Sequence, residues 1–324
     1  MQPRAVVAHT VLKGHTSAQP RAVFRHLSIP ASHNTSIYPS YSLASRVQGA
    51  LRQELLSWKA LPSHERGPSP PPTLLSFTPA PTYTLGRRQA KPLSEEEHTR
   101  LQAPLHVKSE ENAESKRFNP VVIPEQRGGL TTYHGPGQLV LWPVIDMRSP
   151  LHAHLSVRDY ACLLEKTTIE VLEKWGITGF TTENPGVWVR SNTTESNGVE
   201  RKIAALGVHL SRHVTGLGVA VNFNVPVIGP GATNPWARIV PCGLGDRGVT
   251  NICAELGREP SSREAALALQ DLALTWASEF ESRLKIRNDA ETLVEGYDLD
   301  GWQNGIADLE IAESLEQTKN SLLP

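Results

Sequence analysis

Residues 127–145 read Arg-Gly-Gly-Leu-Thr-Thr-Tyr-His-Gly-Pro-Gly-Gln-Leu-Val-Leu-Trp-Pro-Val-Ile, so a glycine-rich segment runs directly into a continuous apolar one. The apolar part, 139–145, predicts a strand. The four glycines before it let the backbone approach a ligand closely, because glycine has no Cβ and readily adopts positive φ. The polar side chains available around such a ligand are those of Arg127, Tyr133, His134 and Gln138. A glycine-rich hairpin with ordinary turn chemistry is the simpler interpretation of such a cluster taken alone.

The composition is that of an ordinary globular protein. With 324 residues and 39% hydrophobic residues, the chain is long enough for one large domain with extensions or for two small domains. A net charge of −1 gives no indication of nucleic-acid binding, which normally needs a basic excess. The sequence contains no apolar run of about 18 residues, the length that a membrane-spanning helix needs.

Three cysteines are present, Cys162, Cys242 and Cys253. Their spacing matches no metal-binding pattern, and three thiols cannot all pair within one chain. The sequence therefore predicts free thiols in a reducing compartment rather than a disulfide framework. We expect Cys162 and Cys253 to be packing residues.

The two ends of the chain differ in charge. Residues 1–53 contain six Arg or Lys residues and no Asp or Glu, which is typical of a mitochondrial transit peptide, although a merely disordered tail has a similar composition. We expect a leader over 1–40, whose removal before Tyr41 leaves the folded part intact. Residues 286–324 are acidic and predict a solvated C-terminal extension.

Periodicity predicts helices and strands along the middle of the chain. We expect an amphipathic helix at 43–59, a helix from a capping box at Ser156 and Asp159 to Gly176, and a third helix that Ser261 or Ser262 caps. Strands are predicted at 74–77, 82–85, 139–145, 186–190, 202–208 and 219–225. The charged segment 89–118 predicts an inserted surface loop, and 191–198 a polar hairpin or loop. This pattern indicates an α/β (α+β) fold, in which helices pack on a mixed sheet.

Cys242 lies in the tight turn Pro241-Cys242-Gly243, directly after the apolar pair Ile239-Val240. Such a turn exposes a thiol at the end of a strand. A nucleophilic cysteine also needs a neighbour that generates thiolate, because an ordinary thiol is only slightly ionised at neutral pH. The candidate neighbours are His134, His209, His213 and Lys202.

Lys202 is unusual because it opens an otherwise apolar strand. Its ammonium group either reaches out to solvent or points into a pocket. In a pocket, desolvation disfavours the charge and allows a proton to be exchanged with a thiol. The sequence leaves these two interpretations open.

Four blocks in order resemble one family. They are Arg-Gly-Gly-x-x-Thr-Tyr-His-Gly-Pro-Gly-Gln at 127–138, Lys-Ile-Ala-Ala-Leu-Gly at 202–207, Gly-Val-Ala-Val-Asn at 218–222 and Pro-Cys-Gly-Leu at 241–244. With Tyr-Thr-Leu-Gly-Arg at 83–87, they closely resemble the lipoyl(octanoyl) transferases, or octanoyl-acyl carrier protein:protein N-octanoyltransferases, in their mitochondrial, fungal-like form. The resemblance implies a catalytic domain over 41–285 with the fold of biotin and lipoate protein ligases.

The resemblance also implies an activity. Octanoyl-acyl carrier protein is the expected donor, and the expected acceptor is a lysine of a lipoyl domain, as in the glycine cleavage H protein or dehydrogenase E2 subunits. The expected location is the mitochondrial matrix. Cys242 takes the octanoyl group as a thioester, and Lys202 favours the thiolate and shuttles the proton. Neither a cofactor nor a metal is expected, because thioester exchange followed by amide formation is downhill without ATP.

A substrate pocket follows from the same resemblance. Its residues are Arg127, Gly128, Gly129, Leu130, Thr131, Thr132, Tyr133, His134, Ala205, Leu206, Gly207, Gly218, Val219 and Ala220. Small and apolar residues there accommodate an acyl chain, while backbone amides face the thioester carbonyl.

Two departures from the family pattern leave questions open. Leu217 stands where bacterial relatives usually have His, so any proton-handling role of that residue is absent or passes to His134 or His213. The segments 89–118 and 191–200 are longer than in compact relatives, and they either shape partner docking or are inert.

Three alternative functions remain. An ATP-dependent lipoate or biotin ligase has the same fold, but needs an adenylate-binding loop and leaves Cys242 unexplained. A non-catalytic acyl-binding protein does not explain why both Lys202 and Cys242 are present. A cysteine hydrolase with a Cys-His pair predicts that His134 matters more than Lys202.

Overall fold

The computed structural model describes residues 24–31, 38–89, 92–108, 115–190, 198–239 and 247–286. Cys242, the segment 191–197, most of the expected leader and the acidic extension from 287 onward lie outside these residues. No helix in the described ranges is both long and apolar enough to cross a membrane.

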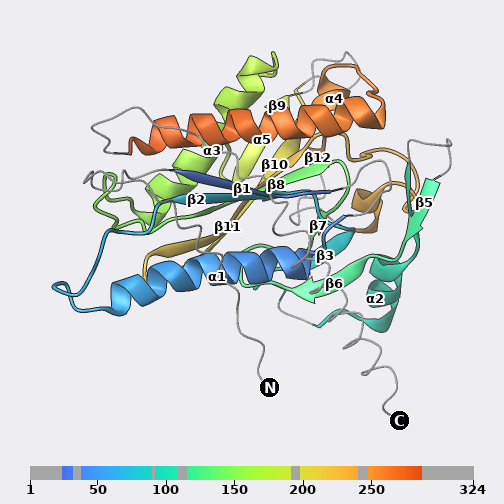
Figure 1. Cartoon of the computed structure of the whole chain (residues 1–324). Coiled ribbons are helices and arrows are strands. Elements are labelled where there is room, and N and C mark those ends of the chain that lie inside the picture. Colours follow the sequence, from blue (N-terminus) through green and yellow to red (C-terminus); the bar gives the residue numbers. More distant parts are fainter. Residues whose placement is uncertain are drawn as a thin grey trace, which may run out of the picture.

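A mixed sheet forms the centre of the molecule (Figure 1). Within the described residues it has seven strands, and its order is β1 (Arg25–Ile29), β2 (Thr73–Phe77), β8 (Gln138–Val144), β11 (Val214–Asn222), β10 (Glu200–Ser211) and β12 (Gly248–Val249), with β9 (Gly186–Arg190) also paired to β10. The pairs β1–β2 and β10–β12 are parallel, and the other pairs are antiparallel. The predicted mixed sheet is confirmed.

Helices cover both faces of this sheet (Figure 1). On one face lie α3 (Val157–Lys174), the short α4 (Ile252–Glu255) and α5 (Ser262–Leu284), and on the other lies α1 (Tyr41–Ala60). The predicted capping box is present, because the Ser156 hydroxyl accepts from the Asp159 N–H at 3.1 Å and the Asp159 carboxylate accepts from the Ser156 N–H at 2.9 Å. Ser261 caps α5.

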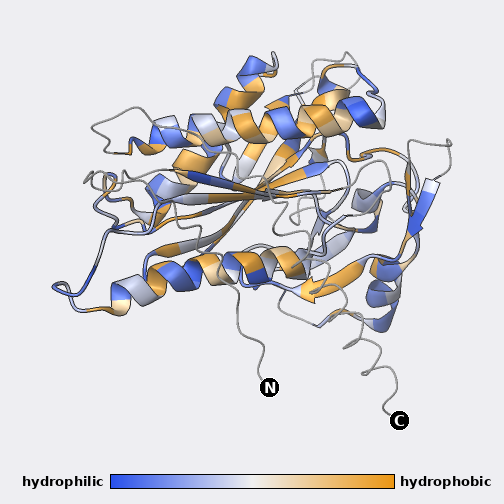
Figure 2. Ribbon diagram, viewed as in Figure 1, coloured by the Kyte–Doolittle hydropathy of each residue, from blue (hydrophilic) through white to orange (hydrophobic). Residues whose placement is uncertain are grey.

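The strand β8 explains why the apolar run after the glycines is continuous. Leu139 and Leu141 pack with α3 and α5, whereas Val140 and Trp142 pack with α1. Every residue of β8 is buried. A strand that is covered on both faces needs no polar alternation. Figure 2 shows the hydrophobic residues running along the strands between the two helical layers.

A smaller unit adjoins the α1 side of the sheet. It contains the three-stranded sheet of β6 (Val121–Pro124), β3 (Thr82–Leu85) and β7 (Thr132–His134), the pair β4 (Leu105–Lys108) and β5 (Ser115–Phe118), the helix α2 (Glu95–Gln102) and the 3₁₀-helix η1 (Pro235–Arg238).

The segment 89–118 is therefore not the irregular loop that we expected. It contains α2, β4 and β5, and Leu101 and Leu105 are buried with Tyr83 in a separate hydrophobic core. Since α2 is only eight residues long and mostly charged, it shows little periodicity. A capping box at Ser94 and Glu97 was the available sequence signal.

The N-terminal boundary is also corrected. The strand β1 falls within residues 1–40, pairs in parallel with β2 over five residues, and follows a Phe24 side chain that is fully buried against Phe280. Removing everything before Tyr41 would therefore take away an outer strand of the central sheet. The folded part begins no later than Phe24.

Candidate active site

The glycine-rich loop is held in shape by Arg127. Its guanidinium donates to the carbonyls of Gly128 at 3.0 Å and Leu130 at 2.9 Å. It also donates to the carbonyl and the hydroxyl of Thr84 on β3, both at 2.7 Å. The sequence predicts that the Arg127 side chain faces a ligand, but these bonds turn its guanidinium into the loop. Arg127 thus ties the loop to β3.

The remaining predicted residues of the loop divide into buried and accessible positions. The Tyr133 ring lies in the core, 5.3 Å from the Tyr83 ring and 5.7 Å from the Trp236 ring. Thr131 and Thr132 are buried. Gly128 is exposed, while Gly129 and Leu130 are half-buried. The accessible part of the loop is therefore 128–130.

Gly137 shows that one glycine of the loop serves the fold. Its φ is +83°, and a Cβ added there would lie 2.6 Å from the Asn224 Oδ1 atom. Its carbonyl accepts from the N–H groups of Phe223 at 2.9 Å and Asn224 at 3.0 Å. This position therefore joins the loop to the end of β11, because only glycine permits the close approach.

A chain of hydrogen bonds runs from His134 to the backbone of Lys202. The His134 Nδ1 atom and the Gln138 Oε1 atom are 2.8 Å apart, and the Gln138 amide donates to the Asn222 Oδ1 atom at 2.9 Å. The Asn222 amide then donates to the Thr250 carbonyl at 3.0 Å. The Thr250 N–H donates to the Lys202 carbonyl, also at 3.0 Å. The predicted loop and the predicted lysine are thus linked.

His134 is neutral at physiological pH. Burial, and secondly the charge of Arg127, lower its pKa to about 3. Since Gln138 presents a carbonyl oxygen, the Nδ1 atom of His134 carries the proton and donates it to that bond. A histidine with so low a pKa takes up little proton near pH 7, so it acts here as a fixed hydrogen-bond donor.

A β-bulge on β10 sets the direction of Lys202. The register against β9 shifts between Lys202 and Ala204, so that Ile203 and Ala204 both face the core under α3 and α5. Side chains normally alternate along a strand, and Lys202 and Ala205 would then point to opposite faces. The extra residue interrupts this alternation between Lys202 and Ala205, and bulges are known to redirect side chains in this way. No pattern in the sequence predicts this bulge.

The ammonium group of Lys202 is enclosed. The side chain is buried, and its Nζ atom donates to the Pro185 carbonyl at 3.0 Å and lies 4.6 Å from the centroid of the Trp188 ring. Lys202 therefore does not reach out to solvent. Neither Pro185 nor Trp188 was singled out from the sequence, because their role depends on the register of β9 against β10.

Glu165 of α3 interacts electrostatically with this lysine. Its carboxylate accepts the Gly186 N–H at 3.0 Å. Burial raises the pKa of Glu165, while that hydrogen bond and the charge of Lys202 oppose the rise. Glu165 thus adds negative charge near the start of β9.

Small residues line the same face of β10 and β11. Ala205 pairs with Ala220, and Gly207 pairs with Gly218. A Cβ added at Gly207 would lie 2.8 Å from the Arg127 Cδ atom, so the stem of Arg127 covers this glycine. The predicted residues Leu206 and Val219 instead pack into the core under α3 and α5. The small-residue face defined by these two pairs is therefore the part of the predicted pocket on β10 and β11 that does not pack under α3 and α5.

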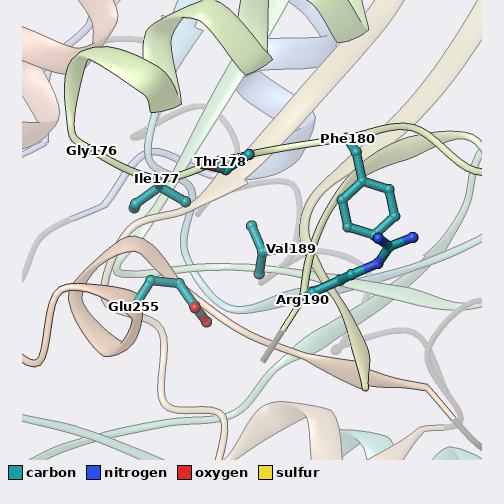
Figure 3. A pocket seen from close by; sticks show the side chains of 7 residues that line it. All are labelled: Gly176, Ile177, Thr178, Phe180, Val189, Arg190 and Glu255. Atoms are coloured by element: carbon teal, nitrogen blue, oxygen red, sulfur yellow. The ribbon is translucent and has the colours of Figure 1, made fainter. Parts of the chain in front are cut away.

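A separate pocket of about 490 Å³ lies beside β9 (Figure 3). It is lined by Gly176, Ile177, Thr178, Phe180, Val189, Arg190 and Glu255. The Arg190 guanidinium lies 4.7 Å from the Phe180 ring centroid. None of the predicted site residues lines it, and Val189 faces away from Lys202, so we do not place the chemistry there.

Cys242 itself lies outside the described residues, but the residues that flank its segment are informative. Arg247 places its guanidinium 5.3 Å from the Trp188 ring centroid, on the ring that Lys202 also contacts. Next along the chain, β12 pairs with Arg201 and Lys202 of β10. The chain therefore leaves the Cys242 segment beside Lys202.

The other candidate thiols and histidines lie elsewhere. Cys253 is buried in the core, where burial raises its pKa to about 11, and Cys162 is half-buried on α3. His209 is seven residues from Lys202, or about 23 Å along β10, and His213 is exposed in the turn beyond. Leu217, which replaces the expected histidine, packs against α1. Among the candidate neighbours, Lys202 is the one whose strand pairs with β12, and its ammonium contacts the same Trp188 ring as Arg247.

Comparison with known proteins assigns the family. A model of the lipoyl protein ligase A/B catalytic domain matches residues 50–272. The chain is 38% identical over 195 residues to the mitochondrial octanoyl-[acyl-carrier-protein]:protein N-octanoyltransferase of Danio rerio, which covers 60% of this chain and 72% of that one. It is 32% identical over 228 residues to the probable octanoyltransferase of Schizosaccharomyces pombe, which covers 70% and 85%.

Among solved structures, a bipartite lipoate protein ligase from Thermoplasma acidophilum is similar with a TM-score of 0.49 and 12% identity, over 85% of this chain and 88% of that chain. That likeness is weak, so the fold assignment depends on the sheet topology and on the family model. Since the model spans more than half of the chain and the relatives are matched over more than two thirds of their length, the chain belongs to the lipoyl protein ligase A/B catalytic-domain family and is, within it, an acyltransferase of the octanoyltransferase group.

Proposed function

We propose that this protein transfers an octanoyl group from octanoyl-acyl carrier protein to a lysine of a lipoyl domain, through a thioester on Cys242. The observation that carries the proposal is the enclosed ammonium of Lys202. It lies against the Pro185 carbonyl and the Trp188 ring, and its strand pairs with β12, which follows the Cys242 segment. A buried cation beside a narrow apolar face fits a thiolate that holds an acyl chain.

The reaction balances in two steps without ATP. In the first, the Cys242 sulfur attacks the donor thioester, a new C–S bond forms, the old one breaks, and the carrier's thiol leaves with the proton that Lys202 held. In the second, the acceptor amine attacks the enzyme thioester, a C–N bond forms, the C–S bond breaks, and the Cys242 thiolate is restored. Lys202 accepts the proton that the amine releases.

The position of Lys202 supports this role. Cys242 precedes Arg247 by five residues, and such a length of chain spans at most about 18 Å. Because Arg247 and Lys202 share the Trp188 ring, this length of chain allows the proposed thiol to approach the ammonium. The Pro185 carbonyl and the face of the Trp188 indole hold the ammonium in place.

The geometry favours Lys202 over His134 as the proton carrier. His134 is neutral, and its Nδ1–H is already donated to Gln138. The cysteine hydrolase interpretation requires His134 to exchange protons near pH 7, which its low pKa opposes. We assign His134 the task of holding the glycine-rich loop and β11 in register.

For the acyl chain, we propose the small-residue face. Ala205 and Ala220 leave room beside Lys202, and the stem of Arg127 over Gly207 closes the far end. Residues 128–130 are the accessible part of the loop, so their backbone N–H groups are the ones available to a thioester carbonyl.

We further propose that the protein functions in the mitochondrial matrix. The Danio rerio relative is named a mitochondrial enzyme. The acid-free N-terminal sequence fits an import signal. Because Phe24 and β1 are part of the fold, we place any cleavage before Phe24 rather than at Tyr41.

The deciding experiment is mass spectrometry after incubation with octanoyl-acyl carrier protein. We expect one octanoyl adduct on the peptide that holds Cys242, labile to hydroxylamine, and none in Cys242→Ala. The matched control Cys162→Ala keeps both the adduct and the transfer to a lipoyl domain. An adduct on Cys162 or Cys253, or no adduct at all, contradicts the mechanism, and an absolute need for ATP would instead identify a ligase.

A further inference from the structure

Glu165 and Lys202 bind opposite ends of one peptide group. The Glu165 carboxylate on α3 accepts a hydrogen bond from the Gly186 N–H at 3.0 Å. The Pro185 carbonyl, which belongs to the same peptide group, accepts one from the Lys202 ammonium at 3.0 Å. This peptide bond is trans, so its C=O and N–H point in opposite directions. The peptide group therefore lies between the carboxylate and the ammonium.

The charges at the two ends suit the dipole of this peptide group. The carbonyl oxygen carries partial negative charge and faces the ammonium, whereas the N–H carries partial positive charge and faces the carboxylate. Hydrogen bonds to ionised groups are stronger than neutral ones, and bonds in a chain polarise one another. Burial raises the pKa of Glu165, but the Gly186 hydrogen bond and the charge of Lys202 both favour its ionised form. The bond from Glu165 therefore strengthens the acceptor that Lys202 uses.

The start of β9 is packed closely around this peptide group. The φ of Gly186 is +123°, and a Cβ added there would lie 2.5 Å from the Ala204 carbonyl oxygen. The Trp188 indole N–H donates to the Asn184 carbonyl at 3.0 Å, and the face of the same ring lies 4.6 Å from the lysine ammonium. The strand β9 thus meets the ammonium with a carbonyl and a ring, and Glu165 fixes that carbonyl from the neighbouring helix.

We propose that Glu165 is a positioning residue for Lys202, and that it acts through the Pro185–Gly186 peptide group. This inference depends on the proposed function, since it takes Lys202 as the proton carrier. The helix α3 is a firm base for the carboxylate, because Leu164 and Thr168 beside it are fully buried in the core. Losing the bond from Glu165 lets the peptide group rotate, which withdraws the Pro185 carbonyl from the ammonium.

Three substitutions at Glu165 separate the hydrogen bond from the charge. Glu165→Ala removes both and should slow octanoyl transfer to a lipoyl domain by about 10- to 100-fold, since a misplacement of about 1 Å can cost about 100-fold in rate. Glu165→Gln keeps a side-chain carbonyl that can accept the Gly186 N–H, so its rate should stay within about threefold of the wild type. Glu165→Asp keeps the charge but is one methylene too short, and it should be slowed like Glu165→Ala.

Chemical labelling of Lys202 gives a second readout that does not involve Cys242. Mass spectrometry follows acetylation of Lys202 by an amine-reactive reagent, at a temperature where circular dichroism shows every variant folded. Glu165→Ala and Glu165→Asp should raise the labelling rate at least about threefold, because a loosened site opens more often. Glu165→Gln should label at nearly the wild-type rate. Lys59 is the internal reference, since its ammonium binds Asp146 at 2.6 Å and its labelling rises only if the fold loosens as a whole.

Glu170→Ala is the matched control, because Glu170 lies on the same helix and pairs with Arg283 of α5 at 2.7 Å. It should keep both rates within about twofold, as substitutions away from a site usually do. If Glu165→Ala does not fold, Glu165→Asp takes its place. Wild-type rates of transfer and labelling in the folded variant would overturn the inference, and so would a Glu165→Gln variant as slow as Glu165→Ala. A wild type that forms no octanoyl adduct on Cys242 would overturn the proposed function instead, and the labelling of Lys202 alone would then decide whether Glu165 holds the lysine.

Discussion

Phe24→Ala tests the corrected N-terminal boundary. Phe24 is fully buried in the core under α3 and α5, and its ring centroid lies 5.8 Å from that of Phe280. It directly precedes β1, whose Ile29 is buried on the α1 face. The sequence predicts that Phe24 and β1 lie in a removable leader. Their contribution to the stability of the fold therefore decides whether they belong to a leader or to the folded domain.

The magnitude follows from burial. Replacing a fully buried phenylalanine by alanine costs about 3–5 kcal/mol, because apolar surface is lost and a cavity remains. A domain of this size loses roughly 2–4 °C of melting temperature per kcal/mol, which predicts a fall of roughly 6–20 °C. Ile228→Ala is the control, since Ile228 is 84% exposed, and it should change stability by less than about 0.5 kcal/mol.

The assay is thermal unfolding followed by circular dichroism, on chains that begin at Arg21 or at Tyr41. The chain from Arg21 should melt like the full chain. The chain from Tyr41 lacks β1, so it exposes the edge of β2 and the Phe280 ring, and it should melt far lower or aggregate. Equal melting temperatures and equal transfer activity in the two shortened chains would refute the assignment of β1 to the fold.

The remaining predictions concern the site and its pH dependence. Lys202→Ala should reduce the rate of octanoyl transfer by at least about 100-fold while circular dichroism shows an unchanged fold. A rate near that of the wild type would indicate that a histidine, and not Lys202, carries the proton. Gly207→Ala should displace the Arg127 stem and slow transfer of octanoyl more than of butyryl, and an equal effect on both chain lengths would contradict the proposed far end of the acyl site. Burial lowers the pKa of His26 to about 4. Between pH 6.5 and about 4 the unfolded chain therefore binds a proton that the folded chain excludes, so the free energy of unfolding should fall as the pH drops through this window. His26→Gln should flatten that dependence in urea titrations, and an identical slope would contradict it.

The sequence predicted the central sheet because the long elements carry strong patterns. The run after Gln138 is apolar throughout since β8 is covered on both faces, and the Ser156 capping box marks the start of α3 to the residue. The short elements were missed for the opposite reason. Neither α2 nor β1 is long enough to show a period, and β1 also lies in a region whose charge composition suggested a leader.

At the site, the residues involved were easier to predict than the directions in which their side chains point. Lys202 stood out because a cation opens an apolar strand, but only the bulge decides which way it points. Arg127 and Tyr133 were expected around an opening, and both are turned inward by contacts that arise from β3, a strand about 40 residues earlier in the chain.

The hydrogen-bond chain from His134 to Lys202 couples the position of the glycine-rich loop to that of the lysine, although their side chains perform different tasks. The loop presents its backbone to a substrate, and its strand β8 contributes Gln138, which binds Asn222 on the next strand. Asn222 then binds the Thr250 carbonyl, and the Thr250 N–H holds the Lys202 carbonyl directly beside the bulge. Every member of this chain is buried, so losing one bond leaves a buried polar group unsatisfied, at a cost of about 1–3 kcal/mol. A change at Gln138 should therefore alter the rate of the lysine-dependent step as well as the binding of the acyl chain, because the backbone that aims Lys202 is fixed from the loop.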